Sequence, residues 1–258
     1  GMSRSRIPAD WIFEEDAIKN SPSRKAGMNE RDELKLKREA IDIMKKIGAE
    51  FGWKLNGATG AACVYFHRFY MLHSIQEFPC PTTSLSCLFL AGKSEETPKK
   101  CKDIAQNALK NFSHIFRVNL NQLMDDVMSM ERVLLQTIKF DFTIDLPYRY
   151  IIMYANDFKS KRAFDAAMVS DIVCCAWPLV NDSFFTHLCL AWEPQIIAVS
   201  LFWLAIKLRQ HEEINETKWW EEHVAELCSD KMETICHEVL DYYTLMNGGN
   251  NSGAAASG

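Results

Sequence analysis

Apolar residues recur at intervals of three and four along most of this chain, the spacing that places them on one face of an α-helix. The pattern is clearest in four stretches, at residues 34–51, 58–72, 99–112 and 121–140. No stretch shows the sustained alternation of apolar and polar residues that is typical of a half-buried strand. The pattern therefore predicts an all-α protein.

Two further stretches, 85–91 and 196–206, are apolar nearly all the way round. A helix without a polar face belongs at the buried centre of a bundle, so two such helices imply two cores. The end of each stretch overlaps a copy of the motif Leu-Ala-x-Lys. The first copy ends at Lys93 and the second at Lys207. This internal repeat predicts two tandem bundles of about five helices each.

These patterns divide the chain into four parts. We expect an N-terminal extension with a short helix at 1–33, a first bundle at 34–145 and a second bundle at 146–246. The remaining residues, 247–258, consist only of Asn, Gly, Ser and Ala. Such a segment cannot bury enough apolar surface to fold, so we expect a disordered tail.

Composition and charge narrow the functional classes. Hydrophobic residues make up 48% of the 258 residues and charged residues 24%, as in soluble globular proteins. The net charge of −5 gives no overall positive field, so we expect no direct DNA binding. The longest apolar run, 196–206, ends at Lys207 and is too short to cross a bilayer, so we expect no membrane partner.

The cysteines give no sign of a metal site or a disulfide framework. There are nine, an odd number, and no two are spaced as Cys-x-x-Cys, so neither a zinc ribbon nor a redox pair is indicated. They are consistent with a reducing compartment, and Cys174 and Cys175 are expected in the core. No phosphate-binding loop, metalloprotease motif or nucleophile elbow occurs either, so we expect no catalytic residue, metal or cofactor.

Several runs of sequence are more distinctive than the helical pattern. They are Tyr-Phe-His-Arg-Phe-Tyr at 65–70, Leu-Phe-Leu-Ala-Gly-Lys-Ser-Glu-Glu-Thr-Pro-Lys-Lys at 88–100, Glu-Arg-Val-Leu-Leu-Gln-Thr-Ile-Lys-Phe-Asp at 131–141, Trp-Glu-Pro-Gln-Ile-Ile-Ala-Val at 192–199 and Trp219–Trp220. Together they resemble the cyclin box, and in detail that of the transcriptional cyclins of the K and T group. The resemblance extends over about residues 11 to 245 and implies two tandem five-helix cyclin boxes.

The resemblance also implies a function. The chain would be a nuclear regulatory subunit, itself without enzymatic activity, that binds and activates an elongation-type cyclin-dependent kinase. Kinases of that group phosphorylate the C-terminal domain of RNA polymerase II and promote transcription elongation.

Positions that match the family motif supply the expected kinase-binding residues. Lys93 and Glu131 would make the polar contacts; without the resemblance, each would be interpreted as a solvated helix charge. The expected apolar groove consists of Leu90, Leu135, Phe140 and Phe142. Leu90 and Leu135 are equally consistent with plain core positions.

Two departures from the family pattern stand out. Ser94 occupies a position where the family usually has an apolar residue, which would remove about 1–2 kcal/mol of contact. The run Lys-Arg-Glu-Ala-Ile at 37–41 replaces the apolar run with which cell-cycle cyclins dock substrates, so no apolar docking pocket is expected there.

Two other classes of protein remain as alternatives. A cyclin-fold general transcription factor would pair similar bundles with a zinc ribbon and a basic face, and this sequence has neither. A helical scaffold would share the fold without binding a kinase. Failure to bind any cyclin-dependent kinase would favour the scaffold.

Overall fold

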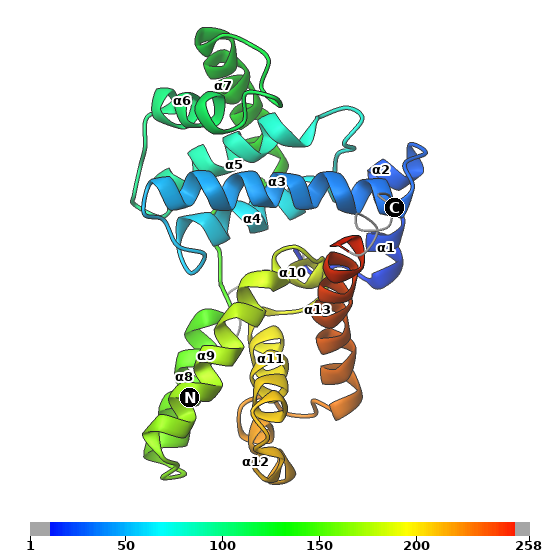
Figure 1. Ribbon diagram of the computed structural model, residues 1–258. Coiled ribbons are helices and arrows are strands. Elements are labelled where there is room, and N and C mark those ends of the chain that lie inside the picture. The colour runs from blue at the N-terminus through cyan, green and yellow to red at the C-terminus, as the bar shows by residue number, and fades with distance from the viewer. Residues whose placement is uncertain (1–10, 251–258) are drawn as a thin grey trace, which may run out of the picture. The chain divides into compact units, whose positions relative to one another are not determined.

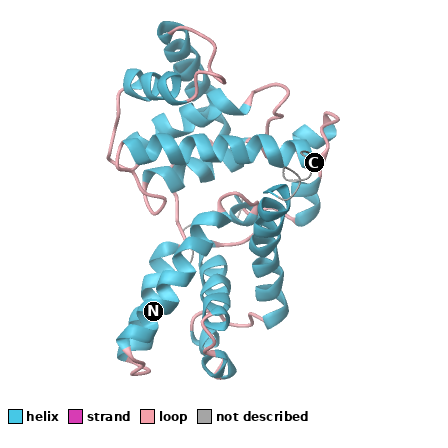
Figure 2. Ribbon diagram, viewed as in Figure 1, coloured by secondary structure: helices cyan, strands magenta, loops and turns pink. Residues whose placement is uncertain are grey.

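The computed structural model of the chain describes residues 11–250, and their side chains as far as Met246. Figures 1 and 2 show helices joined by loops, with no strand among the described residues. The all-α prediction is therefore confirmed. The chain divides after Leu146 into two compact units, whereas the sequence suggested a division after residue 145. Of the predicted disordered tail, residues 251–258 lie outside the described residues.

The first unit is built around one buried helix. Its elements are α1 (Glu15–Lys19), α2 (Pro22–Lys25), α3 (Glu30–Glu50), α4 (Ala58–Phe69), α5 (Cys80–Ser94), α6 (Cys101–Asn111) and α7 (Leu120–Thr137). Helix α5 packs against α3, α4, α6 and α7, and Figure 1 shows it among them. Leu85 and Leu88 are fully buried, as the absence of a polar face predicts. Pro81 in the first turn starts this helix, because its missing N–H has no partner there in any case.

The second unit repeats this plan. Its elements are α8 (Tyr148–Ser160), α9 (Ala166–Ser183), α10 (Leu188–Ala191), α11 (Pro194–Leu208), α12 (Glu212–Glu216), the 3-10 helix η2 (Trp219–Glu222) and α13 (Ser229–Asn250). Helix α11 is central and packs against α8, α9, α10, α12 and α13. Trp219 is completely buried, with its ring edge-on to Phe158 and Phe202.

The expectation that Cys174 and Cys175 belong to the core is wrong. Cys174 is exposed and Cys175 is half-buried, although both lie in an apolar stretch of α9. The buried positions of this part of the helix are Ile172 and Ala176, which are four residues apart and therefore share one face. Cys174 lies away from that face, and Cys175 lies at its edge.

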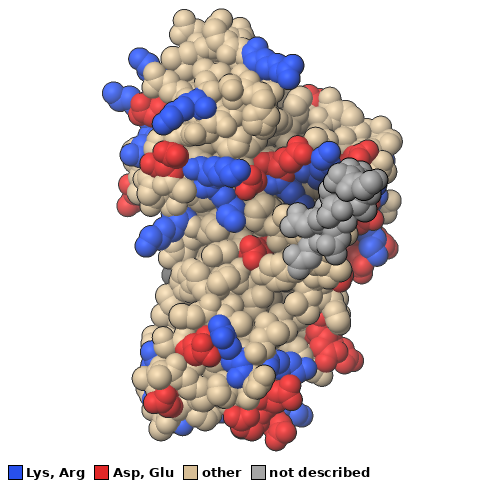
Figure 3. Space-filling model, viewed as in Figure 1, with Lys and Arg blue, Asp and Glu red and all other residues tan. Residues whose placement is uncertain are grey.

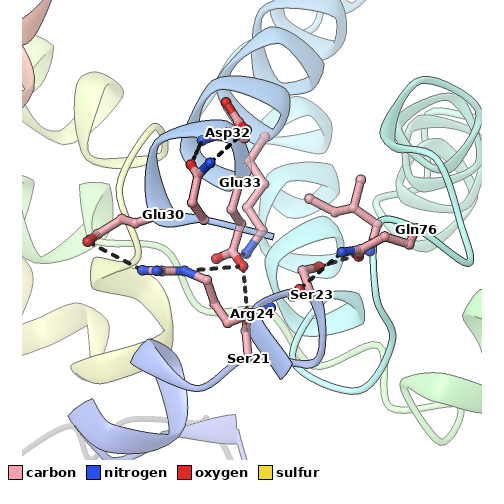
Figure 4. Close-up of polar contacts among 10 residues, drawn as sticks. Ser21, Ser23, Arg24, Glu30, Asp32, Glu33 and Gln76 are labelled. Carbon is pink, nitrogen blue, oxygen red and sulfur yellow. Dashed lines mark hydrogen bonds and ion pairs between the residues drawn. The ribbon is translucent and has the colours of Figure 1, made fainter. Parts of the chain in front are cut away.

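The N-terminal extension is attached to the first unit by a buried polar cluster, shown in Figure 4. The Ser21 hydroxyl donates to Glu33 Oε2 at 2.5 Å, and Lys37 Nζ lies 3.2 Å from Glu33 Oε1. Arg24 Nε approaches the same carboxylate at 3.8 Å. Glu33 and Lys37 are 2% and 3% exposed, so this is an ion pair inside the protein.

Ser23 attaches the extension to a second element, the loop between α4 and α5. The Ile75 N–H donates to Ser23 Oγ at 2.9 Å, and Gln76 Nε2 donates to the Ser23 carbonyl at 3.1 Å. Figure 4 shows Ser23 and Gln76 facing each other on the side away from Glu33. The extension is therefore held from two directions.

We expect Lys37→Met to lower the free energy of unfolding by about 3 kcal/mol, because it leaves the buried Glu33 carboxylate without its principal cation. Burial lowers the pKa of Lys37, and the charge of Glu33 opposes that shift, so the two charges depend on each other. Urea unfolding measures the loss. The control is Lys35→Met, which removes an exposed lysine from the same helix.

The double variant Glu33→Gln, Lys37→Met should recover much of the stability, since no uncompensated charge remains buried. A loss below about 1 kcal/mol for Lys37→Met alone would mean that Ser21 and Arg24 suffice to compensate Glu33.

The second unit contains a pH-sensitive pair, in which His223 Nε2 is 2.9 Å from Asp157 Oδ2. Burial lowers the pKa of His223, and the neighbouring Asp157 only partly opposes this. The folded chain therefore binds this proton less readily than the unfolded chain, whose histidine has a pKa of about 6.5. The stability contributed by neutral His223 is complete above that pH and is lost as the pH falls through the folded-state pKa.

We therefore expect the unfolding free energy to fall between about pH 7.5 and pH 5.5, and to fall less in His223→Gln. Urea unfolding at both pH values measures the difference, since all other titrating groups are common to both proteins. Equal losses in the two proteins would contradict the assignment to His223.

Candidate functional site

Lys93 and Glu131, which the sequence predicted separately, lie together. Lys93 is in the last turn of α5, Glu131 is in the middle of α7, and their side chains form an ion pair. The Lys93 side chain is 43% exposed and that of Glu131 is 11% exposed. The pair thus occupies the rim of the first unit, where a partner can reach it. Their contact with a kinase stays a prediction.

An aromatic ring that sequence reasoning did not single out supports Lys93. The ammonium group lies 4.1 Å from the centroid of the Phe89 ring, four residues earlier on α5, a cation–π contact. In the second unit, Lys207 lies 4.1 Å from the centroid of the Trp203 ring. The repeated motif therefore includes an aromatic residue one helical turn before its lysine, a signal visible in the sequence.

The four residues of the expected apolar groove differ in exposure. Phe140 is 60% exposed and Phe142 is 43% exposed, so both rings are available to a partner. Leu135 is half-buried. Leu90 is only 4% exposed and belongs to the core around α5. Of the predicted groove, the two phenylalanines supply most of the surface.

The backbone after α7 places Phe140 in an unusual conformation. Lys139 and Phe140 both have a φ of 55°, the left-handed region, which costs a residue with a Cβ about 1–2 kcal/mol. The Phe140 N–H donates to the Leu135 carbonyl and the Asp141 N–H to the Ile138 carbonyl, each at 3.0 Å. Strain of this kind persists only where the surroundings enforce it, and it occurs often at functional sites.

Asp141 anchors the chain directly after Phe140. Its Oδ1 accepts the Thr143 N–H at 3.0 Å, and its Oδ2 accepts the indole N–H of Trp11 at 3.2 Å. Burial alone would raise the pKa of Asp141, but hydrogen bonds from Thr143 and Trp11 hold it below its ordinary value. Sequence reasoning assigned no role to Trp11 or Asp141.

The surface of the first unit carries mixed charge. On the face shown in Figure 3, Lys and Arg alternate with Asp and Glu among the coloured residues of this unit. The described residues contain no group of three or more His, Cys, Asp or Glu that could hold a metal ion. No helix in the described part of the chain is long and apolar enough to cross a membrane.

Comparison with known proteins places these residues in a family context. The model of the cyclin N-terminal domain matches residues 11–143. Human cyclin-K is 40% identical over 245 residues, which cover 91% of this chain but 41% of that protein. Cyclin-T of Drosophila melanogaster is 29% identical over 236 residues, or 90% of this chain and 21% of that protein. The chain thus spans about two fifths of human cyclin-K.

Two solved structures share the fold. One is a chain of a yeast complex described as the RNA Pol II CTD kinase CTDK-1, with a TM-score of 0.69, 17% identity and coverage of 93% of this chain and 73% of that one. The other belongs to the CAK complex of Chaetomium thermophilum, with a TM-score of 0.71, 17% identity and coverage of 90% and 76%. The predicted tandem-bundle fold is therefore confirmed.

The geometry at Phe140 leads to a stability prediction. We expect Phe140→Asn to raise the free energy of unfolding by about 0.5–1 kcal/mol, because Asn tolerates the left-handed region better and the exposed ring loses little burial. Urea unfolding tests this. Phe142→Asn is the matched control, since the backbone at Phe142 is outside the positive-φ region and no gain is expected. A loss above about 1 kcal/mol for Phe140→Asn would show that the ring is packed in solution.

Proposed function

This chain belongs to the cyclin family, and we propose that it is the regulatory subunit of a transcriptional cyclin-dependent kinase. In this role it binds and activates an elongation-type kinase that phosphorylates the C-terminal domain of RNA polymerase II. The observation that carries the proposal is the 40% identity with human cyclin-K, which extends over 245 residues and hence over both units. We place the protein in the nucleus for the same reason.

The solved structures of similar fold support the same assignment. The yeast complex is described as a kinase of the RNA polymerase II C-terminal domain, and a further neighbour with a TM-score of 0.66 belongs to a complex described as yeast TFIIK. We extend this type of substrate to the kinase that this chain would bind. The chain itself would contribute no catalytic group.

A cyclin acts by stabilising one conformation of its partner. An active kinase needs a glutamate on a mobile helix to pair with the lysine that orients the ATP phosphates. A regulatory subunit favours this state only if it binds the inward position of that helix more tightly than the outward one. The surface it needs is rigid, partly apolar and supplied with fixed hydrogen-bonding groups.

The rim of the first unit has these properties. Lys93 supplies an ammonium donor for the kinase backbone and Glu131 supplies an acceptor. In the free chain each compensates the other, so Glu131 is not left buried without a cation. Phe140 and Phe142 add two exposed rings, and aromatic anchors tend to dominate interface energies.

We expect Glu131→Arg to weaken kinase binding by about 2–5 kcal/mol, because it places a like charge where an acceptor is required. Lys93→Glu should act similarly. Isothermal titration with the kinase subunit measures both. Arg132→Glu reverses an exposed charge at the next position of α7 and is the control, with little effect expected.

The double variant Lys93→Glu, Glu131→Lys separates binding from folding. It restores an ion pair inside the chain but presents each charge at the wrong position, so stability should return while kinase affinity should not. Recovery of both would remove these residues from the interface.

The partner is identified by co-elution with transcriptional and cell-cycle kinase subunits, followed by assays on a peptide from the polymerase C-terminal repeat. Activation confined to the transcriptional kinases is the expected result. Activation of a cell-cycle kinase instead would contradict the transcriptional assignment. Binding to no kinase would favour a helical scaffold, and tight binding of DNA would favour the general-transcription-factor class.

A further inference from the structure

We propose that Trp11, Tyr65 and Arg68 hold residues 139–143 in the conformation that presents Phe140 and Phe142 to the partner. We call residues 139–143 the presenting segment. We propose in addition that Ser94 couples this segment to Lys93. The inference rests on the proposed function, since the partner is the kinase, and it assigns a positioning role to residues for which the resemblance implied no part in kinase binding.

The first tie comes from the N-terminal extension. Trp11 is only 4% exposed and donates its indole N–H to Asp141, a residue 130 positions away in sequence. The same ring lies beneath the Arg68 guanidinium, whose carbon is 5.1 Å from the ring centroid. Arg68 in turn donates from Nη1 to the carbonyl of Thr143 at 3.4 Å. One stacked pair thus contacts Asp141 and Thr143, the two residues that flank Phe142.

The second tie runs through Ser94. The Tyr65 hydroxyl lies 3.0 Å from Ser94 Oγ and 3.4 Å from the Phe142 carbonyl, and Ser94 Oγ donates to the Ala91 carbonyl at 3.3 Å. Burial raises the pKa of Tyr65 to about 12, so its proton is present as a donor at neutral pH. The Tyr65 hydroxyl therefore bridges Ser94, a residue that sequence reasoning treated as a lost contact, to the presenting segment.

The opposite end of the segment is fixed as well. The Thr137 hydroxyl donates to the Val133 carbonyl at 2.7 Å and lies 2.9 Å from His73 Nε2. The last turn of α7 is thereby attached to the loop that follows α4.

The segment needs these ties because it cannot hold its shape by burial. Two of its residues are in the left-handed region, and Phe140 and Phe142 are 60% and 43% exposed. Without these contacts the segment would relax to conformations of lower free energy, and a partner would have to order it again on binding. Rigidity before binding removes that ordering cost from the affinity. These contacts therefore raise the affinity, because they fix the conformation of the presenting segment in the free chain.

The test compares two tyrosine variants of the same helical region. Tyr65→Phe removes the hydroxyl that reaches Ser94 and Phe142. Tyr70→Phe is the matched control, because its hydroxyl is also buried but donates to the Phe78 carbonyl at 2.7 Å, away from the presenting segment. Trp11→Phe is the third variant and removes the indole N–H while keeping an aromatic ring near Arg68.

Two readouts are taken. Hydrogen exchange of the Phe140, Asp141 and Thr143 amides is measured in the free chain, and the dissociation constant is measured with the kinase that the unaltered chain binds. We expect faster exchange at these amides and about fivefold weaker binding for Tyr65→Phe and Trp11→Phe, the equivalent of one net hydrogen bond. Tyr70→Phe should leave both quantities unchanged, even where it lowers overall stability.

A double-variant cycle distinguishes positioning from general destabilisation. In a chain carrying Phe140→Ala and Phe142→Ala, the further change Tyr65→Phe should cost no additional affinity, because the rings it positions are gone. An unchanged cost in that background would overturn the proposal, as would normal exchange and binding in Tyr65→Phe and Trp11→Phe. Failure of the unaltered chain to bind any kinase is a different outcome, which overturns the proposed function and with it the role of the segment.

Discussion

Burial of α5 on all sides is the constraint on which the first unit depends. A helix without a polar face has to be covered by its neighbours, and α3, α4, α6 and α7 do so. The end of α5 is less covered, and there the sequence changes to Lys93 and Ser94, which are exposed and half-buried respectively. The same packing that builds the core therefore fixes the place of Lys93 and brings α7, with Glu131, beside it.

The local pattern of the sequence predicted the fold but not the contacts between residues that are distant in the sequence. Helical spacing and the two all-apolar stretches predicted the fold, because each is a property of neighbouring residues. The attachment of Trp11 to Asp141 could not be predicted in this way, since it joins residues 130 positions apart. The pairing of Lys93 with Glu131 likewise depends on how α5 packs on α7. Cys174 was assigned wrongly because an apolar stretch does not say which helix face is buried.

At the candidate site, the exposure that binding would require opposes the burial that stabilises the fold. The proposed binding surface would need exposed rings such as Phe140, and a ring that stays exposed contributes little to the stability of the folded chain. The left-handed backbone at Lys139 and Phe140 adds to the cost. The first unit offsets these costs with polar contacts made elsewhere, from Trp11, Tyr65 and Arg68. The residues that stabilise this segment are thus different from the residues that it exposes.

The contact between Trp11 and Asp141 also has a consequence for the order of events during synthesis. Chains emerge from the ribosome with the N-terminus first, and contacts between distant residues form late. A nascent chain shorter than 141 residues contains Trp11 but not the carboxylate that accepts its indole N–H. The proposed partner-binding face would therefore be completed only after the whole first bundle has been made, and unfinished chains would lack it.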